Sequence, residues 1–292
     1  MVDLHMHTTN SDGTDTVEET LKKAENLKLD YISITDHDTC KGYEELKKID
    51  IDKIYSGKII KGIELKCLYK ERTVDVLGYN IDIEKMNKWL STFYKDKSRA
   101  TIQMKNFNFL YEKCKEMGIT MSKKEDIIWN PEVDWASVKI YDDFKKYSEN
   151  ESKFPEDLWN DFSTFTRKYC ADLHYPLYID RTGDYPSLEE AIRAIKEADG
   201  LVFMPHIFIY KWVPTEERYK FVEEIVQNYE VDGFECYYPD FSEEQKEYIL
   251  NLCDKKGLYK SGGSDSHGTN KPERYRLGGQ NVPTEIVKAW AK

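Results

Sequence analysis

The chain has 292 residues, of which 40% are hydrophobic and 33% charged, a composition that fits a soluble globular protein and excludes an intrinsically disordered one. Its formal net charge of -11 argues against general binding to nucleic acid, which needs a basic face. A small phosphorylated ligand is compatible with this charge if bound metal ions reverse the local field.

The opening residues and the cysteines predict a cytoplasmic protein without a membrane segment. The segment Met1–His5 has neither the basic nor the apolar region of a signal peptide, and no apolar run is long enough to span a membrane. The six cysteines lie far apart and include no Cys-x-x-Cys pair, which favours reduced, buried thiols over a zinc finger.

Two regions alternate short apolar runs with helical stretches. In residues 1–80 the predicted strands are Val2–Met6, Tyr31–Thr35, Ile59–Ile63 and Val74–Gly78, with a helix over Thr16–Leu29. In residues 187–292 they are Leu201–Met204, Gly233–Tyr237 and Leu258–Gly262, with helices near Ser187–Ala198, Thr215–Asn228 and Ser242–Lys256. Ser242 and Gly257 are typical start and stop signals for the last of these helices. Repeated strand–helix units predict an α/β protein with a parallel sheet or a barrel, here of seven strands.

Residues 81–186 do not follow this alternation. A long helical stretch is expected from Glu84 to Met117, and the sequence after it is charged, contains tryptophans and shows little strand signal. We therefore interpret 81–186 as an inserted, mainly helical domain. Residues 1–80 and 187–292 would then form one discontinuous domain.

Histidines and carboxylates collect at the ends of the predicted strands. In chain order they are His5, His7, His37, Glu64, Asp75, His206, Glu235, Asp265 and His267. Residues i and i+2 of a strand face the same side, so His5 and His7 can bind one ion. Imidazoles and carboxylates that meet at the C-terminal ends of barrel strands suit zinc, iron or manganese. Taken singly, each motif has a structural explanation, such as a capped turn at Thr35–Thr39; together they predict a metal site.

These residues carry a resemblance to the PHP (polymerase and histidinol phosphatase) family. The segments similar to its motifs are His5–His7 with Ser11–Thr14, Thr35–Thr39, Gly62–Glu64, Val74–Tyr79, Met204–His206 and Gly263–Gly268. Two positions depart from the family pattern, because Asp75 replaces the usual histidine and Ile207 replaces the proline after His206. The resemblance implies a distorted seven-stranded (β/α)7 barrel with a helical insertion between strands four and five.

The resemblance also implies two or three divalent metal ions, which would be zinc, iron or manganese. One ion would be held by His5, His7, Glu64 and Asp265, a second by Glu64, Asp75 and His206, and a third by Asp12, His37 and His267. A hydroxide that bridges two metals would attack phosphorus. Asp36, Asp38 or a ligand histidine such as His267 would assist the leaving group, and the sequence does not choose among them.

Three further residues have open or secondary roles. Glu235 either orients a ligand histidine or pairs elsewhere. Arg99 resembles the phosphate-binding arginines of relatives, although a solvated helix charge explains it slightly better. His174 is interpreted as structural.

The function predicted from these observations is that of a phosphoesterase that acts on a nucleotide, an oligonucleotide end or a phosphorylated metabolite. A histidinol-phosphatase-type phosphomonoesterase is one form of it. An amidohydrolase-like enzyme that cleaves C–N or C–O bonds would use similar ligands, but the motif order argues against it. A metal-binding regulatory domain without catalysis is a third alternative, which Asp75 keeps open. Neither long duplex nucleic acid nor a membrane is an expected partner, and the oligomeric state stays open.

Overall fold

The computed structural model describes residues 1–291, which divide into two compact units. The first unit consists of residues 1–69, 73–92 and those from 186 onward, and the second of residues 70–72 and 93–185. Each unit has a hydrophobic core of its own. All predicted metal ligands lie in the first unit, which combines the two ends of the described chain.

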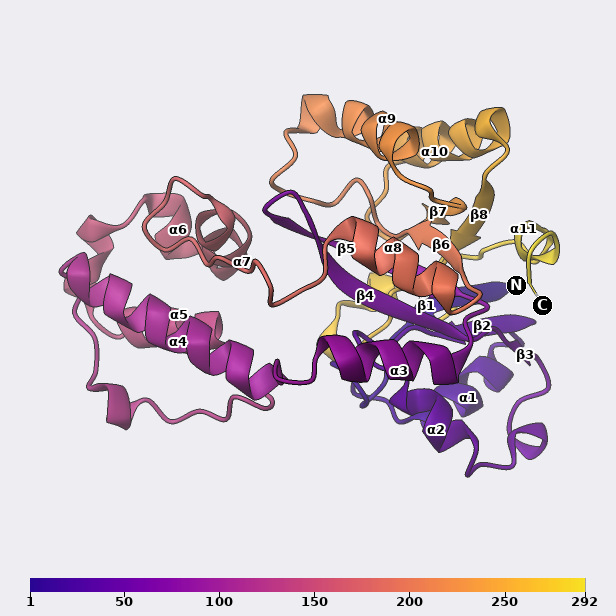
Figure 1. Cartoon of the computed structure of the whole chain (residues 1–292), viewed down its shortest axis with the longest axis horizontal. Coiled ribbons are helices and arrows are strands. Elements are labelled where there is room, and N and C mark those ends of the chain that lie inside the picture. Colours follow the sequence, from indigo (N-terminus) through magenta and orange to yellow (C-terminus); the bar gives the residue numbers. More distant parts are fainter. Residues whose placement is uncertain (292) are drawn as a thin grey trace. The chain divides into compact units, whose positions relative to one another are not determined.

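The first unit is built on eight strands in two sheets (Figure 1). The strands are β1 (Val2–Met6), β2 (Tyr31–Ile34), β3 (Lys58–Ile59), β4 (Gly62–Tyr69), β5 (Arg72–Tyr79), β6 (Leu201–Met204), β7 (Gly233–Tyr237) and β8 (Tyr259–Gly262). The first sheet has the order β1-β2-β3 and is parallel, and the second has the order β4-β5-β6-β7-β8. In the second sheet β5 pairs antiparallel with β6, whereas β6, β7 and β8 are parallel. A mixed α/β fold is therefore confirmed.

The two sheets are linked by single bridges rather than by continuous ladders. Met6 pairs with Ser266 just after β8, and His37, just after β2, pairs with Glu64 in β4. No closed barrel is detected among residues 1–291, and the predicted distorted seven-stranded barrel with an inserted domain is not confirmed. Both bridges nevertheless lie at ligand-bearing segments, so they bring the metal-site residues of the two sheets together.

A tyrosine hydroxyl explains why the predicted strand Ile59–Ile63 is divided between the two sheets. The Tyr43 hydroxyl lies 2.8 Å from the Ile34 carbonyl and 3.1 Å from the Ile60 carbonyl, and it accepts a hydrogen bond from the Gly62 amide at 2.7 Å. It therefore occupies the place where a backbone ladder would continue. A Cβ on Gly62 would approach the Ser33 hydroxyl at 2.3 Å, so only glycine fits at this junction.

Seven helices lie in the first unit. They are α1 (Val17–Asn26), α2 (Lys41–Leu46), α3 (Ile83–Phe93), α8 (Leu188–Glu197), α9 (Arg218–Asn228), α10 (Glu243–Lys256) and α11 (Glu285–Lys288). Only the last residue of α3 is assigned to the second unit. Helix α8 contacts β4 and β6, and α10 contacts β7 and β8 (Figure 1). Ser242 forms a capping box with Gln245 at the start of α10, and Gly257 ends the helix at a φ of 68°. The predicted start and stop signals of this helix are confirmed.

Helices are the main regular elements of the second unit. Its helices are α4 (Arg99–Glu116), α5 (Ala136–Phe144), α6 (Glu156–Asn160) and α7 (Phe162–Arg167). The helical stretch predicted from Glu84 to Met117 is divided into two helices, because the chain leaves the helical conformation after Phe93 and starts α4 at the N-cap Ser98. The Ser98 hydroxyl accepts a hydrogen bond from the Thr101 amide at 3.2 Å, which stabilises a new helix start. Assignment of this unit as a cap domain stays a prediction.

None of the helices in residues 1–291 combines the length and the apolar character that crossing a membrane requires.

Candidate metal centre

Strand ends in the first unit bring the predicted ligands together. His5 lies in β1, Glu64 in β4 and Asp75 in β5, while His7, His37, His206, Asp265 and His267 follow the ends of β1, β2, β6 and β8. Asp12 lies in the loop between β1 and α1. The rings of His5 and His7 are 5.3 Å apart, as expected for two residues that share one side of a strand.

Glu64 lies at the middle of the cluster and is 1% exposed. Its Oε2 is 3.1 Å from Nε2 of His5 and 3.1 Å from Nε2 of His7, and its Oε1 is 2.9 Å from Nε2 of His206. Asp265 adds a second carboxylate, because its Oδ1 is 3.3 Å from His7 Nε2 and 3.6 Å from His5 Nε2. The structure thus places together the four residues predicted for the first ion.

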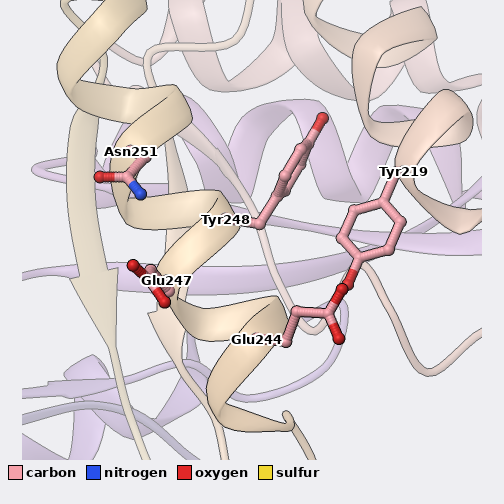
Figure 2. A pocket seen from close by; sticks show the side chains of 5 residues that line it. All are labelled: Tyr219, Glu244, Glu247, Tyr248 and Asn251. Carbon is pink, nitrogen blue, oxygen red and sulfur yellow. The ribbon is translucent and has the colours of Figure 1, made fainter.

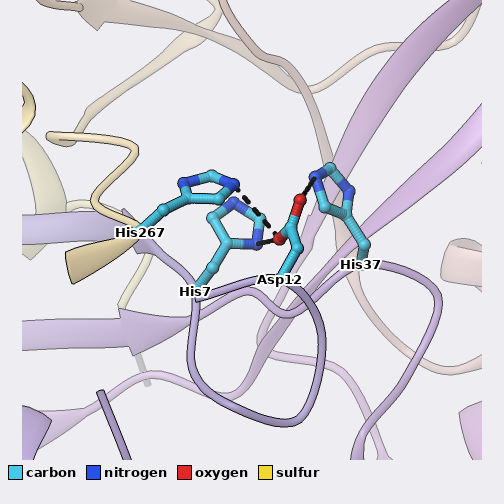
Figure 3. A group of neighbouring side chains, drawn as sticks. All are labelled: His7, Asp12, His37 and His267. Atoms are coloured by element: carbon cyan, nitrogen blue, oxygen red, sulfur yellow. Dashed lines mark ion pairs between the residues drawn. The ribbon is translucent and has the colours of Figure 1, made fainter. Parts of the chain in front are cut away.

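A second group surrounds Asp12, as Figure 3 shows. Its carboxylate lies 3.1 Å from Nε2 of His267 and 3.9 Å from Nε2 of His37, which are the two partners predicted for it. His7 joins this group as well, since its Nδ1 is 3.8 Å from Asp12. His7 therefore faces one group of ligands with Nε2 and another with Nδ1.

Asp75 lies at the edge of the cluster. Ligand atoms of Asp75, Glu64 and His37 lie within 4.8 Å of one another, and Lys66 Nζ is 3.7 Å from Asp75 Oδ1. His206 instead forms a group with His5 and Asp265, in addition to its contact with Glu64. The set predicted for the second ion is thus divided between two groups: Glu64 and Asp75 belong to one, and His206, which Glu64 contacts, belongs to the other.

Several buried polar atoms of the cluster have no hydrogen-bond partner among the described residues. They are both ring nitrogens of His7, Nδ1 of His37 and of His206, and one carboxylate oxygen each of Asp12 and Asp75. Buried polar atoms are costly without a partner, and nearby carboxylates here lack hydrogen-bonding geometry. Imidazole nitrogens and carboxylate oxygens in this arrangement fit zinc, iron or manganese.

The family of this chain follows from a comparison of its sequence with models of protein families. A model of the PHP domain matches residues 3–268, which is most of the chain. The chain belongs to the PHP domain family.

Individual relatives of this PHP domain are phosphoester hydrolases by name. It is 23% identical to phosphoribosyl 1,2-cyclic phosphate 1,2-diphosphodiesterase of Eggerthella lenta, over 91% of this chain and 94% of that protein. A shorter match, 32% identical over 81 residues and covering 28% of each chain, is to the 5'-3' exoribonuclease Rnm of Escherichia coli.

Two solved structures share the fold. One is a Bifidobacterium adolescentis protein described as a metal-dependent phosphoesterase, with a TM-score of 0.65, 22% identity and coverage of 99% of this chain and 94% of that chain. The other is an amidohydrolase from Chromobacterium violaceum, with a TM-score of 0.64, 22% identity and coverage of 95% and 94%. The family and the named relatives together support a metal-dependent phosphoesterase, which is a hydrolase.

Electrostatics in this PHP domain keep the carboxylates ionised. Burial raises the pKa of Glu64 and of Asp265, but His5 and the other imidazoles nearby lower both pKa values by more, so each lies well below its ordinary value. Burial lowers the pKa of His7, but Asp265 and Glu64 outweigh it and raise this pKa to about 9. Burial, together with the neighbouring His7, lowers the pKa of His37 to about 4. Metal binding must therefore displace protons from the histidines with raised pKa.

Glu235, whose role the sequence left open, contacts two ligand residues. It is fully buried, and its Oε1 lies 3.0 Å from Nδ1 of His5 while its Oε2 accepts a hydrogen bond from the His206 amide at 2.8 Å. A carboxylate on Nδ1 leaves Nε2 of His5 free to face Glu64 and a metal ion. Glu235 thus orients the His5 ring.

We expect Glu235→Gln to lower metal affinity by about 10-fold to 100-fold, because the amide weakens the interaction that fixes the His5 tautomer. Competition with a chelator of known affinity measures this change. Glu243→Gln is the matched control, since the Glu243 side chain is 92% exposed. Equal affinity in both variants would show that Glu235 does not act on the metal site.

The structure also places the predicted residues that are not ligands. Asp38 Oδ1 accepts a hydrogen bond from the Lys66 amide at 3.1 Å. Arg99 and His174 lie in the second unit, where the Arg99 guanidinium stacks 4.2 Å from the Trp135 ring and donates to the Val133 carbonyl at 3.1 Å. A phosphate-binding role for Arg99 stays a prediction.

The sequence analysis did not predict two residues that contact the ligand Asp265. Lys271 Nζ lies 2.5 Å from Asp265 Oδ2, and the Tyr238 hydroxyl donates to the same oxygen at 2.8 Å. Both hold Oδ2, which turns Oδ1 toward the histidines. Tyr238 directly follows β7, so the strand-end rule points to it once tyrosines are considered as well as histidines and acids. Lys271 lies in an irregular loop and carries no such signal.

A shallow depression on the surface involves none of these residues. It is lined by Tyr219 of α9 and by Glu244, Glu247, Tyr248 and Asn251 of α10 (Figure 2). The candidate site is therefore the buried cluster at the strand ends.

Proposed function

We propose that this phosphoesterase hydrolyses a small phosphate ester of a sugar or nucleotide, with two or three ions of zinc, iron or manganese in the cluster. The observation that carries the proposal is His7, whose two ring nitrogens face two groups of ligands. The relative that matches nearly the whole chain acts, by its name, on a phosphoribosyl cyclic phosphate. The match to an exoribonuclease is confined to 81 residues. A small ester is therefore better supported than a long RNA, in line with the net charge of -11.

The proposed ligand sets follow the contacts. His5, His7, Glu64 and Asp265 would hold one ion, and Asp12, His37 and His267 another, with Glu64, His206 and Asp75 available for a third. Divalent metals supply a Lewis acid for the phosphate oxygens and lower the pKa of coordinated water.

Proton transfer to the leaving oxygen is proposed for Asp38, because His267, the other predicted donor, is already used as a metal ligand in the sets above. His267 Nδ1 lies 2.9 Å from the Asp265 carbonyl, so Nδ1 carries the proton in the neutral ring and Nε2 faces Asp12. This contact keeps the ring in one orientation.

A cytoplasmic location also remains a prediction from the sequence.

Elemental analysis and a substrate panel on the same preparation test the proposal. We expect two to three equivalents of zinc, iron or manganese per chain. We also expect turnover of bis-p-nitrophenyl phosphate, p-nitrophenyl phosphate or cyclic nucleotides, and a chelator should abolish this turnover. Turnover of monoesters alone would point to a phosphomonoesterase of the histidinol-phosphatase type. Hydrolysis of amides or lactones without hydrolysis of phosphate esters would favour an amidohydrolase-like reaction. Tightly bound metal without any turnover would favour a regulatory domain.

Asp75→His tests whether Asp75 is a ligand in place of the usual histidine. We expect equal or higher metal content, because imidazole is the softer ligand and Asp75 lies in one group with Glu64 and His37. Asp75→Ala is expected to lower the content by up to one equivalent. Metal analysis after gel filtration measures both variants. A sharp fall of metal content in Asp75→His would show that the carboxylate has another task, such as holding Lys66.

A further inference from the structure

Asp36 lies two residues after the end of β2 and is only 1% exposed. Its Oδ1 accepts hydrogen bonds from the Thr8 amide and from the Ser11 hydroxyl, both at 2.7 Å. Its Oδ2 accepts a third hydrogen bond from the Thr8 hydroxyl, also at 2.7 Å. Both oxygens of this buried carboxylate therefore face one short segment, Thr8 to Ser11.

That segment carries Asp12 into the cluster. Thr8 is the centre of the loop, because its carbonyl accepts from the amides of Ser11 and Gly13 and its hydroxyl accepts from the Asn10 amide. A Cβ on Gly13 would lie 2.3 Å from the His7 carbonyl, so the loop folds tightly back on β1. Asp36 thus holds the segment from Thr8 to Ser11, and the residue that follows this segment is the candidate ligand Asp12.

Asp12 depends on this loop for its position. Its side chain is 40% exposed, and no helix or strand fixes its backbone. Beyond Asp12 the loop is attached to the segment after β8, where the Thr14 amide donates to the His267 carbonyl at 3.2 Å and the Asn270 side chain donates to the Asp12 carbonyl at 2.9 Å. Without the attachment at Asp36, one end of the loop would regain conformational freedom.

We infer that Asp36 is a positioning residue, which holds Asp12 in the group formed with His7, His37 and His267, and that it is not the group that transfers a proton. The inference rests on one part of the proposed function, namely that the group of Asp12, His7, His37 and His267 binds a metal ion. An acid or base must reach the reacting oxygen, whereas the Asp36 carboxylate is turned toward Thr8 and Ser11. If the loop holds Asp12 in place only part of the time, the apparent metal affinity falls to that fraction of its full value.

Asp36→Asn and Ser11→Ala test this role in the full chain. Asn replaces one acceptor oxygen by a donor, and Ser11→Ala removes one donor without touching a titratable group. Asp52→Asn is the matched control, since Asp52 is exposed. We expect both test variants to lose the most weakly held metal, with its affinity about 10-fold to 100-fold lower, and excess metal to restore turnover. The shape of the pH–rate profile should not change.

Hydrogen exchange of the metal-free proteins provides a readout that does not depend on metal or on activity. The amides of Thr8 and Gly13 are expected to exchange faster in both variants than in the unmodified chain. Unchanged hydrogen exchange of these amides would overturn the inference. A second contrary outcome is a variant that keeps its full metal content, loses turnover that added metal does not restore, and lacks one limb of the pH–rate profile. If Asp36→Asn fails to fold, Ser11→Ala still decides. Absence of metal from the unmodified protein would refute the proposed function, while the exchange result would still test the loop.

Discussion

Replacing His7 with alanine is expected to abolish metal binding and hydrolysis together while the chain stays folded. His7 is the residue that both main groups of ligands share, with Nε2 3.1 Å from Glu64 and Nδ1 3.8 Å from Asp12. Its ring also packs 4.1 Å from that of His267 and 4.4 Å from that of His37, measured between centroids. Removing it takes a donor from two sites at once.

We expect His7→Ala to lower metal affinity by more than about 100-fold, because loss of a residue that merely orients a ligand already costs about 10-fold to 100-fold. Metal content and turnover of a phosphodiester, measured on one preparation, check this result, and circular dichroism checks the fold. His174→Ala is the matched control, because His174 is the exposed histidine of the second unit. Full activity in His7→Ala would refute the assignment of the metal site.

Glu64→Gln is expected to remove two metal ions at once. The Glu64 carboxylate contacts His5 and His7 through Oε2 and His206 through Oε1, so it can bridge two ions. Its pKa lies well below the ordinary value, with burial outweighed by His5 and other imidazoles, so the group is ionised at neutral pH. Glutamine has nearly the same shape but no charge, and its amide nitrogen cannot bind a metal ion.

His206→Ala makes the prediction for Glu64 specific. His206 contacts Glu64 through a single nitrogen, so its removal should cost one ion or fewer. The number of metal equivalents per chain, measured after dialysis against a metal buffer, separates a loss of two from a loss of one. Equal losses in the two variants would mean that Glu64 does not bridge. Glu243→Gln again controls for the change of charge.

The sequence predicts the candidate ligands well because strand ends obey simple geometry. His5 and His7 have the i, i+2 spacing that places two rings on one side of a strand, and the other ligands follow the ends of strands or lie within them. Asp12 is found only through its family motif, because it lies in an irregular loop whose position depends on Asp36.

The parts that the sequence does not predict depend on contacts between distant segments. The division of the third predicted strand results from the Tyr43 hydroxyl, which comes from helix α2. The orientation of His5 results from Glu235 in β7, far along the chain. Lys271 reaches Asp265 from a loop without regular structure. No local pattern of residues contains these contacts, so periodicity and motif spacing cannot reveal them.

The cluster combines residues from both ends of the described chain, which has a consequence for its synthesis. Asp265 and His267 leave the ribosome long after His5 and His7, on the order of tens of seconds at the usual rate of translation. During that time the nascent chain displays an incomplete set of donors, and the loop of Asp12 lacks its attachment to His267 and Asn270. The complete set of candidate ligands therefore exists only after translation has passed β8.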